Sequence, residues 1–229
     1  MSSSTAAPEA IKRSGRHRVT EFLAANGALV GLVLVALVMF IATPKFLTTQ
    51  NLLNVGVQAA VTAILAFGMT FVIVTAGIDL SVGSVAALSA ICAGWAVTTG
   101  GMPGWLALVV GPLVGLLAGA VSGLAIAYGK LPAFIATLAM LSIARGLTLV
   151  VSGGRPIEMP GAVTWLGANI GPVPVPIVVM IVAAIITSFI LTRTVFGRSL
   201  YAIGGNEEAA RLAGLPVKRT TAAVYALSG

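Results

Sequence analysis

The stretch "GPLVGLLAGAVSGLAIA", residues 111–127, carries no charge and places glycine at every fourth position. Gly111, Gly115, Gly119 and Gly123 form this row, and Ala127 continues it. Residues four apart share one face of a helix, so this face is bare and lets a neighbouring helix approach closely. The alternative is that glycine is simply common in membrane helices. The strict register favours a packing face at the centre of a helix bundle.

The composition of the whole chain indicates a membrane protein. Of its 229 residues, 58% are hydrophobic and 8% are charged, whereas an ordinary soluble domain carries about 25% charged residues. The mean hydropathy is +1.07. A net charge of +7 could suggest nucleic acid, but no zinc-finger spacing, basic helix or aromatic-basic patch accompanies it. An integral membrane protein is therefore expected.

Apolar runs long enough to cross the membrane recur along the chain. They lie at 22–43, 55–76, 80–99, 104–128, 132–151 and 173–192, and another begins near Thr220. Each is close to the ~20 residues that a spanning helix needs. Backbone groups in lipid must be satisfied internally, so these segments are helices. The expected fold is an all-α polytopic membrane helix bundle with six complete spans and the start of a seventh.

The distribution of basic residues predicts the orientation. If residues 1–21 form a cytoplasmic tail ahead of a membrane domain at 22–229, the outer loops hold only Lys45 and Arg155. The cytoplasmic side then holds Lys12, Arg13, Arg16, Arg18, Lys130, Arg193, Arg198, Arg211, Lys218 and Arg219. This bias follows the positive-inside rule and places the polar segment 193–219 in the cytoplasm.

Polar residues inside the spans are candidates for a substrate pathway. Asn54, Gln58 and Thr62 are spaced by four, and amides facing lipid would be costly. A wet pathway and hydrogen bonding between helices explain this stripe equally well. In "TAGIDLSVGS", residues 75–84, we expect Gly77 to end one helix and Asp79 or Ser81 to cap the next. A capped turn is the simpler interpretation, and a broken helix that lines the pathway is the alternative.

One further charge lies well inside a span, and no catalytic motif is present. Arg145 can extend toward the outer surface or pair with Glu158, and we favour the pair. The chain has one histidine, one cysteine, no phosphate-binding loop and no metal-binding motif. We therefore expect no catalytic residue, metal or cofactor in this chain, and an energy source elsewhere.

The stretch "GRSLYAIGGNEEAARLAGLPVKR", residues 197–219, predicts a short, capped helix followed by a sharp bend. Asn206 can cap a helix whose first turn holds Glu207 and Glu208, where acidic residues suit the helix dipole. Glu207 and Arg211 are four apart and can pair, and Gly214 can stop the helix before Pro216 opens another. Such caps suggest a rigid docking site for a partner protein.

The chain resembles the permease subunits of ribose-type ATP-binding-cassette (ABC) sugar importers from about residue 50 onward. The resemblance rests on the span spacing and on "AFGMTFVIVTAGIDLSVGSVAAL" (66–88), "LPAFIATLAMLSIARGLTLVVSGGRPI" (131–157) and residues 197–219. It implies a bacterial inner-membrane protein that works with an ATPase subunit, an extracytoplasmic sugar-binding protein and a second permease copy. It also implies that the coupling segment contacts the ATPase through Gly205, Asn206, Glu207, Glu208, Ala209, Ala210, Arg211 and Gly214.

Several functional alternatives remain open at this point. Permeases of this kind have about ten spans, so a chain ending in a seventh is expected to be a fragment, and an inactive remnant is one alternative. An ion-coupled carrier and a membrane scaffold are others, although the scarcity of charge in the spans disfavours ion coupling. Within the ABC class the substrate could be ribose, a furanose, an inositol or a sugar-like signal.

Overall fold

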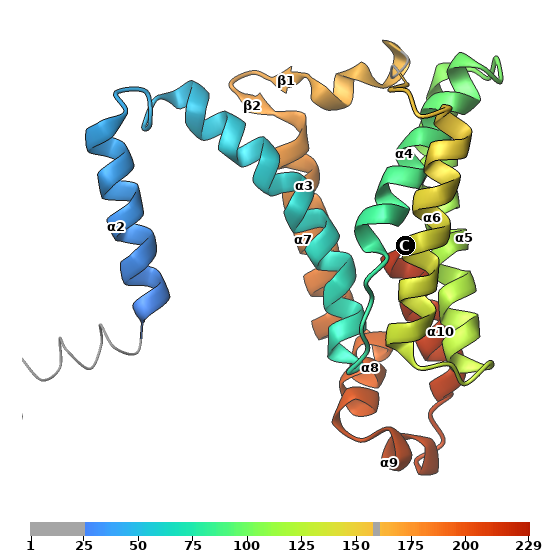
Figure 1. The fold of residues 1–229 in the computed structure, drawn as a ribbon. Helices are drawn as coiled ribbons and strands as arrows, with labels where there is room; N and C mark the ends of the chain where they lie inside the picture. Colours follow the sequence, from blue (N-terminus) through green and yellow to red (C-terminus); the bar gives the residue numbers. More distant parts are fainter. Residues whose placement is uncertain (1–25, 158–160) are drawn as a thin grey trace, which may run out of the picture. The chain divides into compact units, whose positions relative to one another are not determined.

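The computed structural model describes residues 26–157 and 161–229, and the expected tail at 1–21 lies outside them. The chain divides into two compact units, residues 1–52 and 53–229. The first unit contains α2 (Gly27–Ala42) and the beginning of α3 (Thr49–Val74). The second contains the remainder of α3 and all later elements, whose order is shown in Figure 1.

The regular structure of the second unit is helical except for one short antiparallel hairpin in the described part. Its elements after α3 are α4 (Val82–Thr98), η1 (Gly104–Leu106), α5 (Ala107–Ala127), α6 (Ala133–Ser152), η2 (Gly161–Gly167), β1 (Asn169–Ile170), β2 (Val173–Pro174), α7 (Val175–Arg193), α8 (Val195–Gly205), α9 (Glu207–Leu212) and α10 (Val217–Ser228).

Among the described residues, four helical segments are long and apolar enough to cross a membrane. They are Thr49–Val74, Gly104–Ala127, Ala133–Ser152 and Val175–Arg193. The apolar helices α2 and α4 have 16 and 17 residues, which is short of the ~20 that cross the hydrocarbon core. The expected helical class is thus supported, but six complete spans are not established. Residues 22–25, which would lengthen the first expected span, lie outside the described residues.

The glycine row of α5 lies at the contacts of this helix with α10 and α4. Gly111, Gly115, Gly119 and Gly123 are all buried. A Cβ atom at Gly123 would lie 2.7 Å from the Ala222 carbonyl oxygen of α10, and one at Gly119 would overlap the Tyr225 carbonyl. The two helices therefore touch through their backbones, which only glycine permits.

Side-chain clusters connect the remaining helices to this pair. Val85 and Leu88 of α4 pack against Met140 and Ala144 of α6, with Val114 of α5 at their edge. A second cluster joins α3, α7, α8 and α10 and contains Phe71, Val72, Leu191, Leu200, Val224 and Tyr225. Helix α10 thus contacts both α5 and the end of the unit that carries α8, as Figure 1 shows.

The α5–α10 contact predicts that a single added methyl group destabilises the protein at α5 but not at α6. Gly119→Ala should destabilise the protein by about 1–3 kcal/mol, because the added methyl group forces two backbones apart. Gly146→Ala in α6 is the matched control, since a Cβ there meets nothing within 4 Å. Heat unfolding in detergent would compare them, and equal stability of the two variants would contradict the packing role of the glycine face.

Candidate functional site

The link between α3 and α4 is non-helical at a depth where neighbouring elements are helical. Residues 75–81 form a turn, a bend and irregular backbone. Val85 and Leu88, in the first two turns of α4, pack against Met140 and Ala144 in the middle of α6. Helix α4 therefore starts level with the middle of α6, as Figure 1 also shows. Backbone of this kind is tolerated within a membrane only when it is buried in protein or lines a wet cavity.

The end of α3 is closed by Ala76, not by Gly77 as the sequence suggested. Ala76 adopts the left-handed conformation with φ 56°, and the Gly77 amide donates to the Val72 carbonyl at 3.0 Å. Glycine is required at 77 for a different reason. A Cβ there would lie 2.7 Å from the Tyr225 hydroxyl and 3.1 Å from the Val72 carbonyl oxygen. The lack of room for a Cβ atom, and not the backbone conformation, therefore explains the glycine at position 77.

Asp79 is buried and stabilises the turn that precedes α4. Its side chain is 6% exposed, and its Oδ1 accepts from the Ser81 amide at 2.8 Å and from the Ser81 hydroxyl at 2.6 Å. Ser81 occupies the N-cap position, but its side chain makes no capping hydrogen bond. Neither residue caps the α4 amides as the sequence suggested, because Asp79 and Ser81 bond to each other.

The link is also fastened to α10. The Tyr225 hydroxyl donates to the Ile78 carbonyl at 3.1 Å, and the Tyr225 side chain is almost completely buried. On the other side of the link, a Cβ at Gly204 of α8 would overlap the Val74 carbonyl and lie 3.3 Å from Thr75 Cα. The link is therefore in contact with both of the helices that flank α9.

The polar stripe predicted on α3 lies on one exposed face of that helix. Asn54, Gln58 and Thr62 are exposed in this chain. Gln58 and Thr62 line a groove of about 500 Å³ with Val55, Ala59, Ala63 and Ala66. The Thr62 hydroxyl donates to the Gln58 carbonyl at 3.3 Å. The structure thus places two of the predicted pathway residues together, whereas Asp79 does not line this groove.

The predicted helix in the polar stretch 197–219 is present as α9. Asn206 is its N-cap and accepts from the Ala209 amide at 2.9 Å. Arg211 pairs with Glu208 at 2.5 Å, and not with Glu207 as expected. The hydrogen bond from Arg211 and, second, the attraction of its charge lower the pKa of the Glu208 carboxyl. Three residues apart is as good a helical spacing as four, so the rotamers decide the partner.

A turn at Gly214 and a small apolar cluster hold α9 in place. Gly214 has φ +84°, and the Leu215 amide after it donates to the Ala210 carbonyl at 3.1 Å, a closed helix end. Ala210 is buried against Ile203 of α8 and Val217 of α10. By contrast, Leu212 is 78% exposed beside the Glu208–Arg211 pair. The segment is therefore an ordered knob with one apolar side chain at its surface.

The structure also brings together residues that the sequence did not connect. Arg145 is exposed on α6 and lines a cavity of about 290 Å³ with Thr148 and with Gly83, Ser84 and Ala87 of α4. The expected partner, Glu158, lies outside the described residues. Inserting arginine at the centre of a spanning helix costs about 2.5–3.5 kcal/mol on cellular insertion scales. The sequence marked Arg145 as a single charge in an apolar run, but it did not indicate which α4 residues lie beside it.

Known proteins similar to this chain are membrane permeases. The family model for the permease component of branched-chain amino acid transport systems matches residues 51–229. The ribose import permease protein of Bacillus subtilis (strain 168) is 43% identical over 214 residues, covering 89% of this chain and 64% of the relative. That of Haemophilus influenzae (strain KW20) is 40% identical over 222 residues, covering 94% and 68%.

A permease for a second sugar is also similar. The L-arabinose transport system permease protein of Escherichia coli (strain K12) is 39% identical over 215 residues, covering 87% of this chain and 62% of the relative. The chain thus spans roughly two thirds of the length of these curated relatives. No solved structure matches the chain. These similarities confirm the resemblance drawn from the sequence and support a multi-pass membrane protein.

The contact between Gly77 and Tyr225 predicts a non-additive pair of substitutions. Gly77→Ala should cost about 1–3 kcal/mol by overpacking, and Tyr225→Phe about 1 kcal/mol through the lost bond to Ile78. The double variant should lose less than the sum, because removing the hydroxyl removes the closest contact of the new methyl group.

Heat unfolding of the four proteins in detergent measures this coupling. Tyr201→Phe is the control, since Tyr201 is exposed. Strict additivity of the two substitutions would show that Gly77 and Tyr225 do not restrict each other.

Proposed function

The chain belongs to the family of transport-system permease components, and we propose that it is the membrane-spanning subunit of an ABC importer for a monosaccharide. The family description mentions branched-chain amino acids. The relatives at 43% and 39% identity are named for ribose and L-arabinose. This sequence similarity carries the proposal, and it makes ribose the first substrate to test.

The polar groups inside the described spans suit an uncharged, hydroxyl-rich cargo. The α3 groove offers the Gln58 amide and the Thr62 hydroxyl, which can exchange hydrogen bonds with sugar hydroxyls. The buried carboxylate of Asp79 is already occupied by Ser81. A proton-coupled carrier would need an ionisable group available to the pathway. ATP hydrolysed on a separate subunit is therefore the favoured energy source.

The topology completes this proposal. The N-terminus and residues 193–219 lie in the cytoplasm, six spans are complete and α10 begins a seventh, within the inner membrane of a bacterium. The basic residues of α8, α9 and the start of α10, including Arg198, Arg211 and Lys218, support this orientation. The importer further contains a second permease copy and an extracytoplasmic sugar-binding protein.

The ordered knob at α9 is the proposed contact with the ATPase subunit. Its backbone is held by the Asn206 cap, the Gly214 turn and the buried Ala210. Exposed Leu212 and the Glu208–Arg211 pair form its surface. Residues 205–214 thus offer a shaped, mixed apolar and charged surface, which is typical of protein–protein contacts.

Sugar uptake tests the proposed function directly. The full-length subunit, produced with its ATPase and binding protein in a bacterium that lacks its own ribose importer, should support uptake of radiolabelled D-ribose. Uptake should stop when the catalytic glutamate of the ATPase is replaced and should persist in the presence of an uncoupler. Uptake that an uncoupler abolishes while ATP remains would favour an ion-coupled carrier instead.

The coupling role of α9 predicts that valine in place of two similar glycines has different effects on binding of the ATPase. Gly214→Val should weaken co-purification of the ATPase, because a β-branched residue at φ +84° strains the turn by roughly 1–2 kcal/mol. Gly153→Val is the matched control. Gly153 has φ +59° and follows the C-terminal end of α6, away from α9. A Cβ atom at Gly153, as at Gly214, would meet nothing within 4 Å.

Both variants should insert in normal amounts, and only Gly214→Val should lose the ATPase. Retention of the ATPase by Gly214→Val, with sugar-stimulated hydrolysis intact, would rule out this segment as the coupling surface. Glu208→Lys, which removes the pairing with Arg211, should weaken retention in the same assay.

A further inference from the structure

A cavity of about 290 Å³ opens between the first turns of α4 and the outer half of α6. Its lining comprises Gly83, Ser84, Ala87, Arg145, Thr148 and Leu149. Because α4 begins directly after the non-helical link, this cavity lies at the helix break and level with the middle of the bundle. Discontinuous helices at this depth commonly border substrate sites in transporters.

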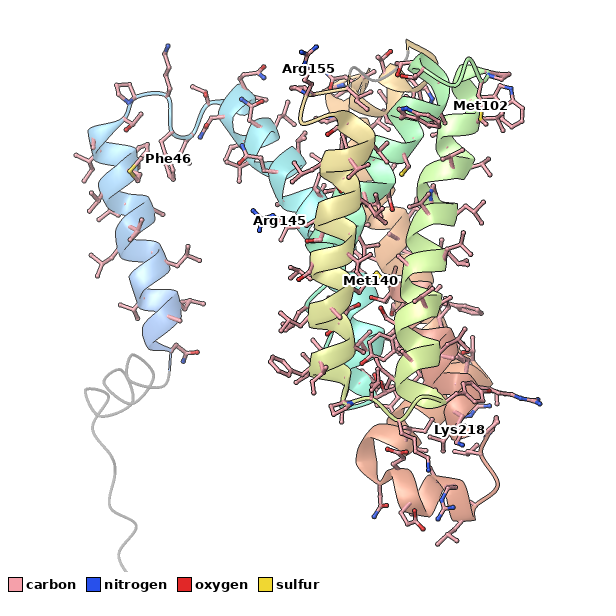
Figure 2. The ribbon with its side chains drawn as sticks, turned by 45° about the vertical axis from the view of Figure 1, so that its right-hand side comes forward. Phe46, Met102, Met140, Arg145, Arg155 and Lys218 are labelled. Carbon is pink, nitrogen blue, oxygen red and sulfur yellow. The ribbon has the colours of Figure 1, made fainter. Side chains whose placement is uncertain are left out.

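Arg145 is the only charged side chain of this lining. Figure 2 shows it projecting from α6 on the side away from α5, whereas Met140 lies on the side of α6 that faces α5. Within the described residues, the guanidinium takes part in no ion pair or hydrogen bond. Its five N–H donors would be unsatisfied against lipid. A guanidinium within a span is stable when it has a polar partner or reaches the membrane surface, and the adjoining cavity is one place for such a partner.

The small residues of the lining leave room for such an occupant. A Cβ at Gly83 would meet nothing within 4 Å, and Ala87 adds only a methyl group to the wall. The volume is close to the lower end of small-molecule pockets, which hold roughly 300–1,000 Å³. A monosaccharide suits this size better than a larger glycoside does.

We propose that this cavity is a sugar-binding subsite on the translocation pathway, in which the Arg145 guanidinium donates to hydroxyl oxygens of the transported monosaccharide. The Thr148 hydroxyl donates to the Ala144 carbonyl at 2.8 Å, so its oxygen remains an acceptor for a sugar hydroxyl. Ser84 faces it from α4 and can donate or accept. This inference rests on the proposed function.

Uptake by variants of the full-length subunit, assembled with its ATPase and binding protein, tests the subsite. Arg145→Gln should lower D-ribose uptake by about ten-fold to a hundred-fold, the range that a hydrogen bond from a charged group contributes. Membrane abundance and ATPase retention should not change. Arg145→Lys keeps the charge but loses the fork, so it should alter the ratio of D-ribose to L-arabinose uptake, which a purely structural role would not.

Arg155→Gln is the matched control, because Arg155 follows the end of α6 and does not line the cavity. Its uptake should equal that of the wild type. If the wild type takes up ribose and the Arg145→Gln variant takes it up equally fast, the subsite is overturned and the proposed function stands. A wild-type protein that takes up no ribose would instead overturn the proposed function.

Cysteine accessibility tests the cavity without relying on transport. In a Cys92→Ala background, Thr148→Cys should react with a hydrophilic, charged thiosulfonate, and D-ribose should slow the reaction. Ile143→Cys, on another face of α6 and outside the cavity lining, should react much more slowly. No reaction at Thr148→Cys means that lipid or another chain covers the cavity. That result, equal rates at the two positions, or absence of protection by ribose would each overturn the subsite.

Discussion

The backbone contact between α5 and α10 is the constraint on which the arrangement of the second unit depends. It exists because one face of α5 has no side chains over Gly115, Gly119 and Gly123. In a bilayer, apolar side chains gain little by leaving lipid for protein, so close packing must hold helices together. A bare face gives the largest possible packing contact. It also fixes the position of α10 along α5, since the carbonyls of Ala222 and Tyr225 lie against the positions that a Cβ atom at Gly123 and Gly119 would occupy.

The position of α10 in turn determines what surrounds the helix break. Tyr225 extends from α10 to the Ile78 carbonyl and leaves no space for a side chain at 77. Val217, at the other end of α10, joins α8 and α9 in one apolar cluster. A single helix therefore connects the glycine face, the break and the knob at α9. These three features lie far apart in the sequence, between residues 75 and 229, yet they share one packing partner.

Local signals in the sequence predicted the elements well and their partners less well. The glycine register marked the bare face of α5, and Asn206 and Gly214 marked both ends of α9, because caps and left-handed turns depend on neighbouring residues alone. Three assignments required tertiary information. Gly77 was assigned to a left-handed turn, but Tyr225 determines its identity by occupying the space. Asp79 was assigned to a helix cap, but it bonds to Ser81.

The cavity beside Arg145 could not be predicted, because several of its lining residues belong to α4, which is separated from Arg145 by the whole of α5 in sequence. The hairpin of β1 and β2 also gave no strand-like pattern, since it is only two residues long on each side and is made by the turn at Gly171, where φ is +62°. Long-range contacts and very short elements leave little trace in the local composition.

Gly204 has a mechanical consequence for the whole unit. Because there is no room for a side chain at this position, α8 and the end of α3 pack backbone against backbone. Helix α4 is held separately, against α5 and α6. Residues 75–81, which lack a helical hydrogen-bond ladder, connect the two groups along the chain, and α10 connects them by packing against both. Any displacement of α8 relative to α4 must therefore change the packing of α10 as well as the torsion angles of residues 75–81.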